Sequence, residues 1–125
     1  MISIDLPWPP SELHPNARVH WAKKANFTKR CRRFAWAQTL SVTGVRPLSV
    51  IGLRRAAHPQ LLTVTAIFCP PDKRRRDTDG MLSACKAYFD GIADALGVDD
   101  SRWQLSLRRE APVKHGLVRI ELAAS

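Results

Sequence analysis

Runs with the two-residue period of a β-strand occur near both ends of the chain and in its middle. Residues 2–6 alternate Ile, Ser, Ile, Asp and Leu, and the prolines that follow end this predicted strand. Residues 61–68 are apolar almost throughout and rich in β-branched side chains, which predicts a strand buried on both faces. Residues 104–110 and 116–122 predict two further strands, and the short connection between them, 111–115, predicts a β-hairpin.

The helical period marks two segments, of which the first covers residues 20–42. Its apolar stripe comprises Phe27, Cys31, Phe34, Ala35 and Val42. Trp21 and Trp36 lie in the same segment, and we expect both side chains in the core.

The second segment, residues 80–96, predicts one continuous helix. Asp79 is placed to cap its N-terminus, and Gly97 suits the position after its last turn. The apolar face comprises Leu82, Cys85, Phe89, Ile92 and Leu96.

The order of these elements favours an α/β or α+β fold, with a small mixed sheet of about four strands and two main helices. Residues 43–60 break both periods and predict a loop with a short strand near Val50. A chain of 125 residues predicts a single domain over 1–125, small enough that a dimer sharing apolar surface is compatible with it.

A large positive charge changes this picture. Lys and Arg number 20 against 11 Asp and Glu, a net charge of +9, which favours nucleic acid as the partner over a generally basic surface. The first predicted helix carries six cations and no acid over residues 21–39, so a DNA-backbone contact and a solvated face are equally good interpretations. The loop before it, with Asn16 and Arg18, is a connector or, as the second interpretation, a phosphate contact.

Other function classes receive no support. Cys31, Cys69 and Cys85 are far apart and odd in number, so we expect buried, reduced thiols and neither a disulfide framework nor a zinc site. The N-terminus lacks the layout of a signal peptide, and no apolar run approaches a membrane span, so we expect a soluble, intracellular protein. The four histidines, His14, His20, His58 and His115, show no metal-ligand spacing and are interpreted as incidental.

Carboxylates and cations meet in the segment 70–103. The basic run 73–76 leads into Asp77 and Asp79, whose side chains point to one side of an extended loop. Mg²⁺ takes a few carboxylates along with water and phosphate oxygens, and it can activate water and stabilise charge during phosphodiester hydrolysis. The alternative is a capped helix with a solvated loop, which two aspartates alone would favour.

A polar face of the second helix extends this candidate site. Asp79, Ser83, Lys86 and Asp90 share one side of a continuous helix, and Lys86 lies about 10 Å from Asp79 along its axis. Lys86 could stabilise a phosphate or a leaving oxygen near the metal. The alternative is a surface lysine paired with Asp90.

A second acidic pair, Asp99 and Asp100, follows the helix. A straight helix over 80–96 is about 25 Å long, and the residues after it return only about 10 Å, so the pair should not reach Asp77 and Asp79 of its own chain. Two such helices packed antiparallel about a two-fold axis would place Asp79 of one protomer near Asp100 of the other. The sequence therefore predicts a symmetric homodimer with two composite sites.

Four motifs together resemble the RusA-type Holliday-junction resolvases: LPWPP near the N-terminus, PPDKRRRDTD, KAYFDGIADALG and DDS. They cover most of residues 70–101 and the first predicted strand. The resemblance implies a small mixed α/β fold, an intertwined homodimer, dependence on Mg²⁺, with Mn²⁺ as a substitute, and paired symmetric nicks in four-way DNA junctions.

The resemblance also implies roles for single residues. Asp77 and Asp79 match the metal-binding pair, and Asp100, or Asp99 one place away, matches the third essential acid. Lys86 matches the catalytic lysine, although it lies two turns beyond Asp79 instead of one, with Ser83 at the one-turn place. Gly80 is a second departure, because many members have Asn there.

The leading interpretation is a junction-resolving endonuclease of recombination and repair, cytoplasmic and encoded by a bacterium, phage or prophage. The residues expected to hold the DNA backbone are Lys73, Arg74, Arg75, Arg76, Lys23, Lys24, Lys29, Arg30 and Arg33. The alternatives are a Mg²⁺-dependent nuclease acting on other branched DNA and a non-catalytic protein that binds DNA junctions.

Overall fold

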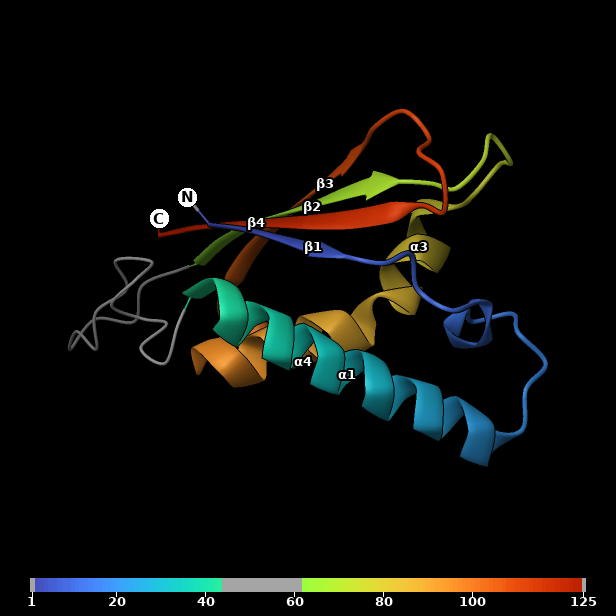
Figure 1. Cartoon of the computed structure of the whole chain (residues 1–125), viewed down its shortest axis with the longest axis horizontal. Helices are drawn as coiled ribbons and strands as arrows, with labels where there is room; N and C mark the ends of the chain where they lie inside the picture. The colour runs from blue at the N-terminus through green and yellow to red at the C-terminus, as the bar shows by residue number, and fades with distance from the viewer. Residues whose placement is uncertain (1, 44–61, 125) are drawn as a thin grey trace.

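The computed structural model describes residues 2–43 and 62–124, which form a four-stranded mixed sheet with helices packed on one of its faces (Figure 1). The strands, in their order across the sheet, are β1 (Ile2–Leu6), β4 (Leu117–Ala124), β2 (Leu62–Cys69) and β3 (Trp103–Arg109). The helices are α1 (Trp21–Thr43), α3 (Thr78–Ala84) and α4 (Lys86–Leu96), with short 3-10 turns η1 (Ser11–Leu13) and η2 (Asp100–Arg102). The predicted α+β fold class is confirmed.

Alternation along the strands creates the core. In-register pairing aligns Ile4 of β1 with Ile120 of β4, and Ile120 with Ala66 of β2. Their side chains therefore form one apolar row across the sheet. All three are fully buried, as is Ile92 of α4. Removing a large aliphatic side chain from water contributes about 1.5–3 kcal/mol, so this face holds the two layers together.

The predicted hairpin between the last two strands is wrong. β2 lies between β3 and β4, parallel to β3 and antiparallel to β4. Parallel strands need a long crossover, and α3 and α4 supply it between β2 and β3. The connection that follows β3 passes the end of β2, where the backbone N–H of Glu110 donates to the carbonyl of Phe68 at 2.9 Å.

The predicted continuous helix over 80–96 is also wrong, because Cys85 separates α3 from α4. Its backbone angles, φ −95° and ψ 1°, depart from the helical region, while its N–H still donates to the carbonyls of Met81 and Leu82 at 3.2 Å. Asp77, not Asp79, is the N-cap of α3. Gly97 ends α4 in the left-handed conformation, as predicted, with φ 70°.

Small residues decide how α1 packs. Cys31, Ala35, Thr39 and Thr43 face the core, and α4 approaches so closely at Gly91 that a Cβ there would lie 2.1 Å from the carbonyl oxygen of Arg32. Of the bulkier residues in the predicted apolar stripe, Phe27 packs against the core, whereas Phe34 and Val42 are 46% and 43% exposed, contrary to the prediction. The expectation that Trp21 and Trp36 are core residues is wrong, since they are 77% and 44% exposed.

The other expectations about the chain have mixed outcomes. The three cysteines are free and buried, as predicted, and burial raises the pKa of the Cys31 and Cys85 thiols. Among the described helices, none combines the length and the apolar character needed to cross a membrane. The loop predicted after α1, with its short strand near Val50, lies outside the described residues.

Candidate functional site

The loop that leaves β2 delivers Asp77 and Asp79 to the start of α3, where both side chains are exposed. They line one open pocket of about 430 Å³ together with Thr78 and Gly80. The opposite wall is residues 14–16, from the connection between η1 and α1. Sequence reasoning therefore placed the two aspartates together correctly, and the fold adds a wall from a distant part of the chain.

The side-chain carboxylates of Asp77 and Asp79 are unpaired within residues 2–43 and 62–124. Asp77 makes no side-chain capping hydrogen bond, and no Lys or Arg of these residues forms an ion pair with Asp77 or Asp79. Mg²⁺ commonly binds through one or two carboxylates, with water and substrate phosphate completing its shell. Two accessible carboxylates on one pocket fit that requirement. No cluster of three His, Cys, Asp or Glu side chains suited to a metal ion occurs in the same described ranges.

The second acidic pair lies beside Lys86. After Gly97 the chain folds back along α4, and the Lys86 ammonium donates to Asp100 Oδ2 and, at 3.0 Å, contacts Asp90 Oδ1. This contact raises the pKa of Lys86 and lowers that of Asp100. Asp99 has a separate role, because its Oδ1 accepts from the backbone N–H of Ser101 at 3.2 Å and caps η2.

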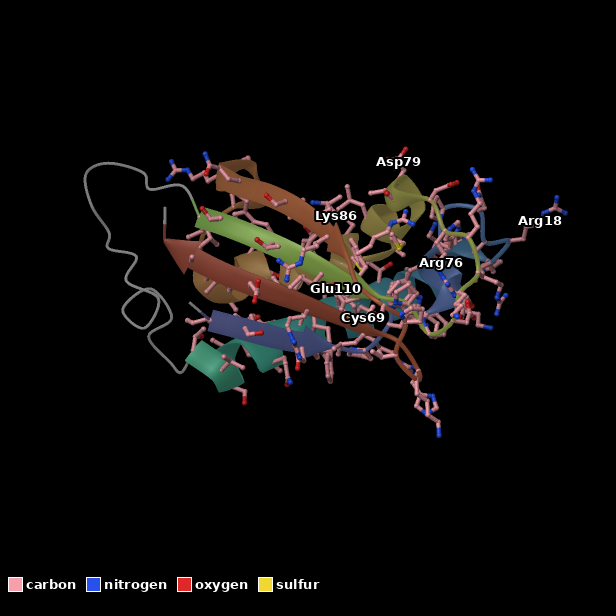
Figure 2. All side chains as sticks on the ribbon, turned by 90° about the horizontal axis from the view of Figure 1, so that it is seen from above. Arg18, Cys69, Arg76, Asp79, Lys86 and Glu110 are labelled. Carbon is pink, nitrogen blue, oxygen red and sulfur yellow. The ribbon has the colours of Figure 1, made fainter. Side chains whose placement is uncertain are left out.

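Figure 2 shows Asp79 on α3 and Lys86 beside β3, with Arg76 on the loop between β2 and α3. The pairing of Lys86 with Asp90 agrees with the surface-lysine interpretation, whereas its pairing with Asp100 was not predicted. The straight-helix estimate failed to anticipate it because the segment divides at Cys85 and turns back after Gly97.

The predicted DNA-binding cations of the β2–α3 loop differ in solvent exposure and in their ion pairs. Arg76 is only 20% exposed, stacks 5.5 Å from the ring of Trp8 and pairs with Asp72 at 2.9 Å. Arg74 also contacts Asp72 but is 84% exposed, and Lys73 and Arg75 are exposed. Arg76 thus organises the loop, while the neighbouring cations face solvent.

A second pocket, of about 420 Å³, lies on this basic side of α3. Its lining includes Trp8, His14, Gly80 and the three loop arginines, Arg74, Arg75 and Arg76. The pocket with the carboxylates and the pocket with the arginines are therefore neighbours across the start of α3. The two exposed carboxylates therefore lie beside the loop arginines, as the sequence suggested.

Asp72 is expected to titrate far below an ordinary aspartate. The Arg76 guanidinium, helped by the backbone N–H of Arg74, lowers the pKa of its carboxyl to about 2. Because the folded pKa lies below the unfolded value of about 3.9, the pair stabilises the fold above that pH and loses its contribution as the pH falls toward 2. A carboxyl-carbon NMR titration measures this, and Arg76→Gln should return the midpoint toward the ordinary value. A midpoint near 4 in the unmodified protein would contradict the ion pair.

The cations of α1 lie on its solvent side. Lys23, Lys29, Arg30 and Arg33 are exposed and Lys24 is half-buried, so all of them remain available for a backbone contact. Arg32 is different, because it makes a bidentate pair with Asp94 of α4, at 2.7 and 3.0 Å. It ties the two helices together.

Two residues at the site escaped the sequence analysis. His14 lines the carboxylate pocket beside Asn16, whose loop was already considered as a phosphate contact. Arg109 at the end of β3 donates to the carbonyl of Arg76 and to Thr78 Oγ1, at 2.7 and 2.8 Å. Arg109 was missed because its position depends on the parallel pairing of β2 with β3. His14 was set aside because only metal-ligand spacing was considered.

Comparisons with known proteins add a relative without an assigned activity. No protein-family model matches the chain. A protein of Xylella fastidiosa, described as an uncharacterized protein, is 38% identical over 115 residues, which span 92% of this chain and 71% of that protein.

Proposed function

Since the chain belongs to the same family as the uncharacterized protein of Xylella fastidiosa, we propose its function from its own site: a Mg²⁺-dependent endodeoxyribonuclease that resolves four-way DNA junctions. The observation that carries the proposal is the placement of Asp77 and Asp79 on one open pocket, directly beside the arginine loop. The resemblance of these motifs to the RusA-type resolvases supports the choice of a branched DNA substrate. Such an enzyme acts in the cytoplasm, where bacterial or phage DNA recombines.

The chain's own residues account for binding and orientation. Asp77 and Asp79 would hold Mg²⁺, or Mn²⁺ in its place, and the ion supplies an activated water and charge stabilisation at the phosphorus. Arg74 and Arg75 face solvent and hold the backbone of the DNA, while Arg76 fixes the loop that presents them. Lys86 offers a cation for the developing charge once DNA competes with Asp90 and Asp100 for its ammonium group.

A symmetric homodimer belongs to the same proposal. A four-way junction is itself two-fold symmetric, so two identical sites can nick opposing strands. In this arrangement Asp100 of one protomer gives up its pair with Lys86, or Asp99 its cap of η2, to approach the Asp77 and Asp79 pocket of the other. The edge strand β3 exposes Leu105 and Leu107, at 39% and 37%, and this apolar surface supports a contact between protomers.

The proposal is tested with a synthetic four-way junction, end-labelled on each strand in turn, and with a linear duplex of the same sequence. We expect paired, symmetric nicks in the junction that require Mg²⁺, disappear with EDTA and are absent from the duplex. Tight binding without cleavage would instead identify a non-catalytic junction-binding protein. Forked and flapped DNA are tested beside the junction, and equal cleavage of all three would identify a nuclease for branched DNA in general.

A further inference from the structure

His14 stands on the boundary between the two pockets of the site. Together with Gly80, it lines both the pocket of Asp77 and Asp79 and the pocket of the loop arginines. A group that bridges the two pockets therefore passes the imidazole. A phosphodiester is such a group, because one of its oxygens can face a cation on the carboxylates while another faces the guanidinium groups.

The loop holds the ring in a defined orientation. The backbone N–H of His14 donates to the carbonyl of Ser11 at 3.1 Å, and the carbonyl of His14 accepts from Ala17 at 3.0 Å. The ring atom Nδ1 accepts from the backbone N–H of Asn16 at 3.2 Å, which assigns the proton of the neutral imidazole to Nε2. Nε2 is the ring atom that lies nearest to Gly80, and its N–H makes no hydrogen bond to any residue in 2–43 or 62–124.

Gly80 is the residue that admits the ring. A Cβ at this position would lie 2.7 Å from His14 Nε2, and its three nearest neighbours are all atoms of that imidazole. Any larger residue at position 80 must therefore displace the ring from the start of α3. Glycine at this position, where many members of the resembling family have asparagine, leaves room for the ring.

We propose that His14 is a substrate-binding residue whose Nε2–H donates a hydrogen bond to a phosphate oxygen of a phosphodiester lying across the two pockets. The oxygen carries negative charge, so the bond is of the stronger, charge-assisted kind, and the donor is oriented before substrate binds. Asn16, which orients the ring through its backbone, lines the same pocket. This inference rests on the proposed function for the identity of the phosphodiester as DNA.

Steady-state cleavage of the junction provides the first test. We expect His14→Ala to lower kcat/KM by roughly 100-fold, the cost of removing one oriented donor, and His14→Gln to recover part of the loss through its amide N–H. His115→Asn is the matched control, because it removes an exposed imidazole from a turn whose positive φ of 68° asparagine tolerates. It should leave kcat and KM unchanged.

Gly80→Ala gives an independent prediction, since it displaces the ring without deleting it. We expect this variant to lose as much activity as His14→Ala. When both changes are combined, Gly80→Ala should cost less than a further two-fold, because the atoms it strikes are gone. Fully multiplicative losses, or a His14→Ala variant with unchanged kcat and KM, would overturn the inference.

An NMR measurement separates failure of the inference from failure of the proposed function. With ¹⁵N-labelled histidine, a thymidine dinucleotide added in the presence of Mg²⁺ should shift the Nε2 resonance of His14 and leave that of His115 in place. If the protein cuts no DNA but this shift occurs, the nuclease proposal fails and the phosphodiester site stands. If the resonance does not move, the inference is wrong whether or not the protein is a nuclease.

Discussion

Replacing Gly91 with alanine is expected to lower the free energy of unfolding by about 3 kcal/mol or more, the largest effect among the glycines of residues 2–43 and 62–124. A Cβ at this position would lie 2.1 Å from the carbonyl oxygen of Arg32 and 3.0 Å from the Cβ of Ala35. The obstacle is the backbone of α1, which cannot rotate away as a side chain can. Alanine gains up to about 1 kcal/mol of helix propensity over glycine, which is too little to offset a separation of α1 from α4.

Urea denaturation of Gly91→Ala beside Gly97→Ala measures this effect. Gly97 is the matched control, because it follows the same helix, has nothing within 4 Å of the added Cβ, and incurs only the strain of its φ of 70°, about 1–2 kcal/mol. Equal losses in the two variants would show that α1 and α4 do not approach as closely as described. A larger loss for Gly91→Ala identifies this contact as the one that sets the position of α4.

The position of α4 matters for the site because Lys86 is its first residue and its end leads directly to Asp100. The bidentate pair of Arg32 with Asp94 closes the same helix interface from its exposed side. A change at Gly91 should therefore disturb the pairing of Lys86 with Asp90 and Asp100 as well as lower the free energy of unfolding. The loop of Asp77 and Asp79 is anchored elsewhere, by Arg76 and Arg109, and should be less sensitive.

Short sequence patterns predicted correctly the bounds of those strands and helices that depend only on neighbouring residues. The strands β1 and β2 and the helix α1 begin and end within one residue of their predicted bounds, because alternation, proline and helical spacing act over a few residues. The partner of β3 depends on how the chain crosses over the sheet, which no short pattern records. The short connection predicted over residues 111–115 therefore suggested a hairpin where β2 in fact separates the strands.

The sequence-based predictions were wrong where tertiary packing, and not hydrophobic spacing, decides the structure. The apolar pattern runs through Cys85 without interruption, so the division between α3 and α4 has no signature in hydrophobic spacing. Trp21 and Trp36 are large and apolar, yet the buried residues of α1 are Cys31, Ala35, Thr39 and Thr43, and both indoles lie outside that stripe. The size of an apolar side chain therefore does not identify the face of α1 that is buried.

Some contacts of the candidate site were likewise predictable from the sequence, and others were not. Asp77 and Asp79 are close in sequence, so their shared pocket was predictable from one segment. His14 reaches that pocket through the loop after η1, and Asp100 reaches Lys86 through the return after Gly97. Both contacts depend on tertiary structure, and the first of them supplies the donor that the sequence analysis had set aside.

Replacing Asp79 with asparagine is expected to reduce Mg²⁺-dependent junction cleavage on the order of 10³-fold, the largest functional effect among single substitutions in the pocket. Asparagine keeps the shape of the side chain and removes the charge that, under the proposed function, would hold a divalent cation beside Asp77. Initial rates on the labelled junction measure the loss. Asp5→Asn is the control, because it removes another exposed carboxylate, on β1, which pairs with Arg119 outside both pockets.

Binding and stability decide how a loss of cleavage is to be interpreted. Asp79 is exposed and pairs with no cation among residues 2–43 and 62–124, so its replacement should change the free energy of unfolding by less than about 0.5 kcal/mol. The arginines and the cations of α1 remain, so the junction should still bind. Unaltered folding and binding with cleavage lost assigns the effect to the cation. Cleavage retained above one-tenth of the original rate would remove Asp79 from the metal site and leave the proposed chemistry without its second ligand.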